Sequence, residues 1–204
     1  MTSFVFDLDS TVLRGELLPR IAAAAGLDGD EMARQTARTV EEGIPFSESF
    51  PARAALLSDV PTLLAARVAC ETPRFERLCV FLRRHCLRCW IVTGNLDVWI
   101  ADLARELGME GRCICSRARM EDGRVAGIEF LLSEKAAVLP ALPGRVVAVG
   151  DGMNDLGMLA AADVGIAFGG AHPIPGPLRR AADFTAETEE ELLCLLESMA
   201  ESPG

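Results

Sequence analysis

The chain has 204 residues, half of them hydrophobic, and is long enough for one or two domains with a substantial core. Thirty acidic side chains against twenty basic ones give a net charge of -10, which argues against a nucleic-acid partner because phosphate backbones require a basic surface. No stretch approaches the roughly 18 uninterrupted apolar residues of a membrane helix, so no membrane partner is expected. Asp7 and Asp9 interrupt the apolar N-terminus, so no secretory leader is predicted. We expect a soluble, cytoplasmic protein.

Short apolar runs predict the strands of a parallel sheet. They are continuously apolar rather than alternating, which suits strands covered on both faces, and they lie at residues 4–6, 90–92, 146–149 and 164–168. Helical patterns between and after them cover residues 96–107, closed by Gly108, residues 155–162, and a stretch from the capping box at Thr188 to Met199. This alternation predicts an α/β fold, a Rossmann-like parallel sheet with helices on both faces.

The stretch between the first two strands has a different character. It lacks a strand run, is rich in Ala, Arg and Glu, and predicts helices over residues 17–25, 30–42, 47–57 and 61–70. An all-helical block placed directly after the first strand is a candidate cap over a site at the end of that strand. We therefore predict a catalytic core over residues 1–13 and 73–204 and a small α-helical cap over residues 14–72. Further along, Asp122-Gly123 between β-capable residues predicts a hairpin.

Seven cysteines are scattered along the chain, and without a secretory leader they are expected to be reduced thiols. Two interpretations stay open for Cys86, Cys89, Cys113 and Cys115. They could supply four sulfur ligands to a structural zinc, or they could be small core residues near strand starts. The single residue between Cys113 and Cys115 favours the second interpretation, because zinc-binding pairs are usually separated by two to four residues.

Two of the apolar runs end in closely spaced aspartates. Asp7 and Asp9 follow the first run, and Asp151 and Asp155 follow the run at residues 146–149. The carboxyl ends of neighbouring parallel strands meet at one edge of a sheet, so these carboxylates should gather there. Such a cluster requires a cation, and carboxylate oxygens suit Mg²⁺, although manganese would also be accepted. The pattern predicts phosphate chemistry, with Asp7 as the nucleophile and Asp9 as the acid and base for the leaving oxygen.

Four motifs together resemble those of the haloacid dehalogenase superfamily. Asp7-Leu-Asp9-Ser-Thr11 resembles the nucleophile motif, Thr93-Gly94-Asn95 the second motif, Lys135 the third, and Gly150-Asp-Gly-Met-Asn-Asp155 the fourth, in family order over nearly the whole chain. The resemblance implies that Thr93 binds the transferring phosphoryl group and that Lys135 holds nucleophile and phosphate together. It also implies that Mg²⁺ is held by Asp7, the backbone carbonyl of Asp9 and Asp151, with Asp155 either a further ligand or a hydrogen-bond partner of the ligands.

Within that superfamily the chain looks most like the phosphoserine phosphatase group. Glu16 falls where the group has a glutamate that contacts the substrate ammonium. Phe46 and Arg53 fall where a phenylalanine shields the site and an arginine binds the substrate carboxylate. The resemblance further assigns Gly94, Asn95 and Asn154 to substrate binding. The second motif departs from the group's usual Ser-Gly-Gly, and Asn95 could crowd or re-pair the substrate amino group.

We therefore expect a magnesium-dependent phosphomonoester hydrolase that forms an aspartyl-phosphate on a small phosphorylated metabolite, phosphoserine being the leading candidate. Two alternatives stay open. The same aspartyl-phosphate could pass to an acceptor hydroxyl, as in a phosphotransferase or mutase. The chain could also be a non-catalytic phosphate-binding regulatory module, although such a module has no need for Asp9. His85 and His172 are expected to be bystanders, because neither sits at a strand end and the proposed scheme needs no histidine.

Overall fold

The structure, a computed structural model, describes residues 1–42, 44, 46–129 and 134–201. In this part of the chain seven strands form one sheet in the order β4-β3-β2-β1-β5-β6-β7. All neighbouring strands are parallel except the antiparallel pair β3–β4. The strands are β1 (Thr2–Phe6), β2 (Cys89–Leu96), β3 (Cys113–Glu121), β4 (Arg124–Glu129), β5 (Arg145–Gly150), β6 (Val164–Phe168) and β7 (Phe184–Ala186). The predicted α/β fold with a mostly parallel sheet is confirmed.

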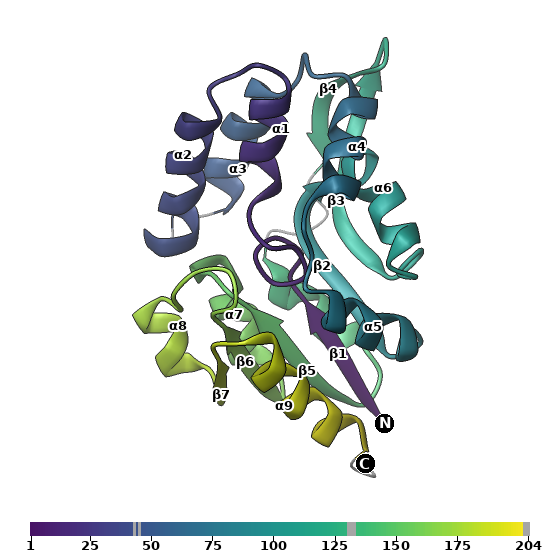
Figure 1. Cartoon of the computed structure of the whole chain (residues 1–204), viewed down its shortest axis with the longest axis vertical. Helices are drawn as coiled ribbons and strands as arrows, with labels where there is room; N and C mark the ends of the chain where they lie inside the picture. The colour runs from purple at the N-terminus through teal and green to yellow at the C-terminus, as the bar shows by residue number, and fades with distance from the viewer. Residues whose placement is uncertain (43, 45, 130–133, 202–204) are drawn as a thin grey trace.

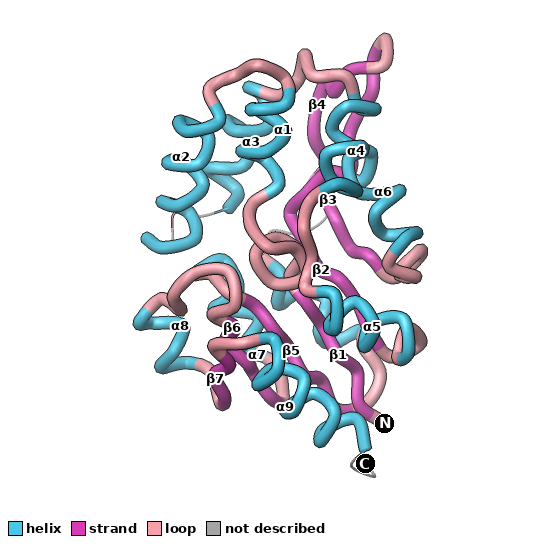
Figure 2. Tube along the Cα trace, in the orientation of Figure 1, coloured by secondary structure: helices cyan, strands magenta, loops and turns pink. Residues whose placement is uncertain are grey.

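Helices connect the strands and form the block after β1 (Figures 1 and 2). The α-helices are α1 (Leu17–Ala24), α2 (Gly29–Glu42), α3 (Phe46–Leu56), α4 (Thr62–Glu71), α5 (Glu76–Arg84), α6 (Asp97–Glu106), α7 (Leu156–Ala161), α8 (Gly176–Ala181) and α9 (Glu189–Glu201). Two short 3₁₀ helices are η1 (Lys135–Ala141) and η2 (Met153–Asp155). None of the described helices is long and apolar enough to cross a membrane.

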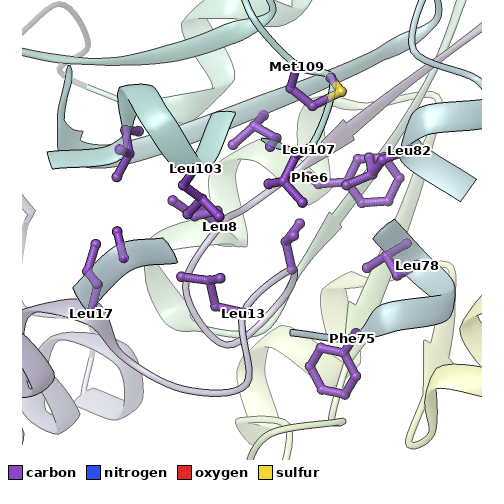
Figure 3. Close-up of a cluster of buried hydrophobic side chains, with 14 of the residues drawn as sticks. Phe6, Leu8, Leu13, Leu17, Phe75, Leu78, Leu82, Leu103, Leu107 and Met109 are labelled. Atoms are coloured by element: carbon purple, nitrogen blue, oxygen red, sulfur yellow. The ribbon is translucent and has the colours of Figure 1, made fainter. Parts of the chain in front are cut away.

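Apolar side chains cover both faces of the sheet. In β1, Phe4 and Phe6 belong to one buried cluster and Val5 to the other, because successive side chains of a strand point to opposite faces. The first cluster includes apolar residues of α5, α6 and α9, and the second includes those of η1, α7 and α8. Figure 3 shows part of the first cluster, with Phe6 of β1, Leu103 of α6 and Leu107 directly after that helix. This burial explains why the central strands are apolar throughout.

Several element ends follow the predicted local chemistry. Gly108, with φ of 72°, ends α6, and the amide of Met109 bonds the carbonyl of Ala104 at 2.8 Å, as in a Schellman motif. Thr188 and Glu191 form the predicted capping box of α9 through bonds of 3.2 and 3.3 Å. Asp122 and Gly123, with φ of 50° and 76°, make the tight turn between β3 and β4.

The helical block leaves and rejoins the sheet at one place. The amide of Arg14 bonds the carbonyl of Pro73 at 2.7 Å, and the amide of Phe75 bonds that of Val12 at 3.1 Å. In Figure 1, α1, α2 and α3 lie together beyond the carboxyl end of β1, whereas α4 lies beside α6. The division into a cap over residues 14–72 and a core stays a proposal.

The cysteines do not form the four-sulfur set considered above. Among the described residues, only three aspartates lie close enough together to share a metal ion as a group of three or more ligands. Cys89 is buried in the core, and Cys86, Cys113 and Cys115 are partly buried against the same apolar cluster. These positions agree with the interpretation of the cysteines as small core residues.

A matched pair of leucine truncations tests the core. Leu103→Ala on α6 removes a side chain that is 1% exposed and should lower the free energy of unfolding by about 2–5 kcal/mol. Leu63→Ala on α4 removes one that is 83% exposed and should change it by less than about 0.5 kcal/mol. Urea unfolding followed by circular dichroism measures both, and equal effects would contradict the described packing of α6.

Candidate active site

The catalytic candidates meet where three central strands end. Phe6 of β1 pairs with Ile91 of β2 on one side and with Val149 of β5 on the other. Asp7 directly follows Phe6, and its amide continues the ladder by donating to the carbonyl of Val149 at 3.0 Å. This register sets Asp7 between the segment that carries Thr93 and the loop that carries Asp151. The parallel sheet thus gathers residues that are distant in sequence.

Lys135 links two buried carboxylates. Its Nζ lies 2.6 Å from Oδ1 of Asp7 and 2.7 Å from Oδ1 of Asp155. Burial acts to lower the pKa of Lys135, but the carboxylates of Asp155 and Asp7 prevail and raise it, so the amine is charged. Burial first, and then the charge of Asp155, raise the pKa of Asp7 well above its usual range, while Lys135 opposes them. The lysine is therefore the main counter-charge of the proposed nucleophile.

Asp155 also fixes the loop after β5. Its Oδ2 accepts the amides of Asp151 and Gly152 at 3.1 and 3.2 Å. The side chain folds so closely over Gly150 that a Cβ there would meet the Cβ of Asp155 at 2.5 Å. Glycine is required at this position by the close approach rather than by an unusual dihedral angle. The fourth motif is therefore built around the Asp155 carboxylate.

Asp151 is held at both carboxylate oxygens. Thr11 donates to Oδ1 at 2.7 Å, and Nε2 of His172 lies 2.7 Å from Oδ2. The hydrogen bond to Asp151 is the main cause that raises the pKa of His172 to about 9. His172 was expected to be a bystander, and the structure places it against Asp151. Its segment follows β6 by a loop, so only the fold shows that it returns to the site.

Three of these carboxylates could hold a metal ion. Asp7, Asp151 and Asp155 are buried, and each offers one oxygen such that these atoms lie within 4.8 Å of one another. The pocket beside them is lined by four carboxylates and two cationic side chains. Buried carboxylates in excess over cations are costly unless a further positive charge compensates them. Their oxygen donors suit a hard divalent cation.

Asp9 lies between the two halves of the site. Its Oδ1 accepts the amide of Leu17 at the start of α1 at 2.9 Å, and its Oδ2 accepts Nδ2 of Asn95 at 2.5 Å. Burial raises the pKa of Asp9 to about 6, although these two hydrogen bonds oppose the shift. One carboxylate oxygen of Asp9 therefore accepts a hydrogen bond from the helical block, and the other accepts one from the end of β2.

Glu16 and Arg53 face the pocket from the helical block. Ser10 donates to Oε1 of Glu16 at 2.7 Å, and burial, followed by the charges of Asp9 and Asp151, raises the pKa of Glu16 to about 8. Arg53 is 6% exposed and donates to Oγ1 of Thr36 at 2.9 Å. Its buried Nε has no hydrogen-bond partner within the described part of the chain. An acid and a guanidinium with spare donor capacity thus line one pocket.

The pocket joins nearly all the predicted residues. The core contributes Asp7, Asp9, Thr93, Gly94, Asn95, Lys135, Asp151 and Asn154. The helical block contributes Glu16, Leu18, Thr36, Thr39, Val40, Phe50 and Arg53. Asp155 does not line the pocket and is fully buried behind it. The roles assigned to these residues stay predictions, since their proximity alone does not test them.

Some residues that line the pocket were not predicted from the sequence. The side chain of Phe46 lies outside the described part of the structure, so its shielding role stays a prediction. Phe50, 2% exposed, lines the pocket and lies one helical turn before Arg53. Helical spacing from Arg53 is the signal that could have identified it. Thr36 and Thr39 share a face of α2 by the same spacing, but threonine in a helix does not by itself mark a site.

Comparison with known proteins places this geometry in a family. Models of haloacid dehalogenase-like hydrolases match residues 4–160 and, separately, residues 131–192. The chain belongs to the haloacid dehalogenase-like hydrolase family. The first match spans the segments that carry Asp7, Thr93, Lys135 and Asp151, so the family assignment rests on the same elements that build the site. The resemblance inferred from the motifs is confirmed.

Several relatives that are similar to the chain in sequence are phosphoserine phosphatases. Over 178 residues the chain is 32% identical to the phosphoserine phosphatase of Archaeoglobus fulgidus, covering 80% of this chain and 51% of the relative. It is 35% identical to phosphoserine phosphatase SerB2 of Mycobacterium tuberculosis, covering 80% and 43%. The chain thus spans about half the length of these relatives. The phosphoserine phosphatase of Halobacterium salinarum is 31% identical, with 86% of this chain and 88% of the relative covered.

Solved structures share the fold. A phosphoserine phosphatase determined as a phospho-aspartyl intermediate analogue superposes with a TM-score of 0.75 at 26% identity, covering 94% of this chain and 97% of the other. A substrate-bound phosphoserine phosphatase complex gives the same TM-score at 25% identity, covering 96% of both chains. These similarities extend over the helical block as well as the sheet.

Removal of the Lys135 charge tests the electrostatics of the site. Lys135→Met keeps the aliphatic stem but leaves Asp7 and Asp155 without their cation, so the metal-free protein should lose about 3–5 kcal/mol of unfolding free energy. Arg34→Met breaks an ion pair to Glu31 whose two side chains are 64% and 47% exposed and should have little effect. Urea unfolding in a chelator at pH 8 measures both. Equal stability of Lys135→Met and the parent would show that the carboxylates are not paired as described.

Proposed function

We propose that the chain is a magnesium-dependent phosphomonoester hydrolase that works through an aspartyl-phosphate on Asp7. The observation that carries this proposal is the placement of Asp7, 2.6 Å from Lys135, in a buried group with Asp151 and Asp155. Both Lys135 and the amide of Leu8 bond Oδ1 of Asp7. Oδ2 makes no hydrogen bond to the described residues, so its lone pairs are available for other partners.

The donor set fits magnesium. Mg²⁺ prefers oxygen ligands and is usually bound by one or two carboxylates together with water and phosphate oxygens. Asp7, Asp151 and Asp155 supply candidate carboxylates, and by family resemblance the backbone carbonyl of Asp9 adds another oxygen. When bound, the ion would neutralise the charge between the carboxylate and the phosphoryl oxygens. Thr11 and His172 would then hold Asp151 in a fixed orientation.

The proposed reaction has two steps carried by the chain's own side chains. Asp7 attacks phosphorus, an O–P bond forms to its carboxylate, and the bond from phosphorus to the substrate ester oxygen breaks. Protonated Asp9 gives its proton to that leaving oxygen. Asp9, now a carboxylate, takes a proton from a water molecule that attacks the phosphoryl group. Phosphate leaves, and Asp7 and protonated Asp9 are restored.

Phosphoserine is the substrate that the pocket favours among small phosphomonoesters. Glu16 and Arg53 line the same pocket and offer an acid for an ammonium group and a guanidinium for a carboxylate. The unpartnered Nε of Arg53 supports an additional acceptor at this position. The relatives named above are phosphoserine phosphatases, which supports the same substrate.

The decisive experiment is phosphate release with magnesium from phosphoserine, phosphothreonine, phosphohomoserine, sugar phosphates and an aryl phosphate. We expect a preference for phosphoserine, loss of at least about 10³-fold in kcat for Asp7→Asn, and a loss of about 10²–10⁴-fold for Asp9→Asn. Activity on the aryl phosphate without a preference for phosphoserine would support the proposed mechanism but rule out phosphoserine as the specific substrate. Parent-like turnover by Asp7→Asn would rule out the mechanism itself.

Two further outcomes address the alternatives. Transfer of phosphate to an added alcohol, found by product analysis, would indicate a phosphotransferase. A long-lived phospho-form without phosphate release would indicate a regulatory module.

Cation binding can be measured without turnover. A ligand present at 100 times its Kd stabilises the folded state by about 2.7 kcal/mol, so millimolar Mg²⁺ should raise the Tm of the chelator-treated protein by several degrees. Asp151→Asn should abolish this shift, because it removes a candidate ligand. Asp59→Asn, at a side chain that is 87% exposed, should preserve it. A shift that persists in Asp151→Asn would place the cation elsewhere.

A further inference from the structure

We infer that Asn95 is a positioning residue that orients two reacting groups at once, the carboxyl group of Asp9 and the hydroxyl group of Thr93. Asn95 is the last of the three residues of the second motif and lies near the end of β2. It is 2% exposed, lines the pocket, and reaches Asp9, which is 86 residues away in sequence. This inference rests on the proposed function and assigns to Asn95 a role other than contact with substrate.

The contact with Asp9 fixes one carboxylate oxygen. Nδ2 of Asn95 donates to Oδ2 of Asp9 at 2.5 Å, while the amide of Leu17 donates to Oδ1 at 2.9 Å. With a donor on each oxygen, the plane of the carboxyl group is set by two separate elements. One lone pair on each oxygen then stays free to carry or receive the proton of the reaction.

The contacts with Thr93 fix a hydroxyl group. Oγ1 of Thr93 accepts the backbone amide of Asn95 at 3.2 Å and its Nδ2 at 3.1 Å. A hydroxyl oxygen has two acceptor sites and one donor, so Asn95 uses both acceptor sites. The hydrogen of Thr93 must therefore point to a third partner. Since Thr93 lines the pocket, that partner is a phosphoryl oxygen of the bound substrate.

The orientation of the Asn95 amide follows from its neighbours. Its Nδ2 faces the carboxylate oxygen of Asp9, and a flipped amide would place two acceptors against each other. Oδ1 is buried and has no hydrogen-bond partner among the described residues. The amide of Asn95 therefore donates from Nδ2 to Asp9 while its Oδ1 lacks a hydrogen bond among the described residues. This arrangement indicates that the contact with Asp9 sets the position of the amide.

A consequence for reactivity distinguishes positioning from simple structural support. An alkyl phosphate such as phosphoserine needs a proton on its leaving oxygen, whereas 4-nitrophenyl phosphate has a good leaving group and needs little protonation. Misplacement of Asp9 should therefore slow the alkyl ester more than the aryl ester. A general loss of folding or of pocket shape would slow both by the same factor.

The test compares kcat and KM of Asn95→Ala on phosphoserine and 4-nitrophenyl phosphate. We expect kcat for phosphoserine to fall about 10²-fold and kcat for the aryl ester less than about 10-fold, with KM for each changed less than about 3-fold. Thr72→Val is the matched control, since Thr72 is also buried and hydrogen-bonded, to the carbonyl of Val68, but does not line the pocket. It should leave the ratio of the two kcat values unchanged. Equal losses on both substrates in Asn95→Ala, or no loss, would overturn the inference.

Asn95→Asp is a second variant that tests the inference if Asn95→Ala does not fold. It keeps the shape of the side chain but replaces the donor to Asp9 by a carboxylate oxygen, so the ratio of kcat values should shift in the same direction and further. A parent-like ratio in Asn95→Asp would also overturn the inference.

A measurement without turnover separates this inference from the proposed function. Unfolding free energies of Asn95→Ala, Asp9→Ala and the double variant, in a chelator, give the coupling between the two side chains, because each single change removes one partner of the hydrogen bond. We expect the double variant to be markedly more stable than the sum of the single changes predicts. Additive effects would overturn the contact even if the chain hydrolyses phosphoserine, and a clear coupling would support it even if phosphoserine is not the substrate.

Discussion

The buried pairing of Lys135 with Asp7 and Asp155 is the interaction on which the site depends. Carboxylates at the ends of adjacent strands repel one another, and burial makes their charged forms more costly. One ammonium group, within 2.7 Å of two of them, offsets part of this cost and leaves a negative excess. That excess is the reason for proposing a divalent cation at the site. The stability of the fold and the proposed chemistry therefore draw on the same set of charges.

The topology of the sheet explains how a few residues from distant parts of the sequence form one site. β1 lies at the centre of the sheet with β2 and β5 as its parallel neighbours, so three strand ends open at one edge. The helical block inserted after β1 returns over that edge and supplies Glu16 and Arg53. Asp9 receives a hydrogen bond from each side, from Leu17 and from Asn95. The proposed acid–base group thus lies where the block and the sheet meet.

Local sequence patterns predicted several elements correctly. They are the strands formed by the apolar runs, the capping box at Thr188 and the turn at Asp122-Gly123. The grouping of Asp7 with Asp151 was predictable because parallel strands align their carboxyl ends. α5 was not predicted, although its buried Leu78, Phe81 and Leu82 recur at helical spacing. The packing of Phe81 at 5.3 Å from Phe4, measured between ring centroids, joins segments far apart in sequence and was not predictable. The contact of His172 with Asp151, and the wall formed by Phe50 and Thr36, depend on how a loop and a helix return to the site, which no local pattern encodes.

Lys135 is also the single lysine of the sequence, all other basic side chains being arginine or histidine. Its side chain is 10% exposed, and its amine contacts two carboxylates. The surface formed by the described residues therefore offers acylating reagents no lysine amine. A reagent that acylates amines can reach Lys135 only when its ion pairs with Asp7 and Asp155 break, so the degree of acylation at this side chain reports how often that happens. The protein carries its own chemical probe at the centre of the site, with no competing signal from lysines elsewhere in the sequence.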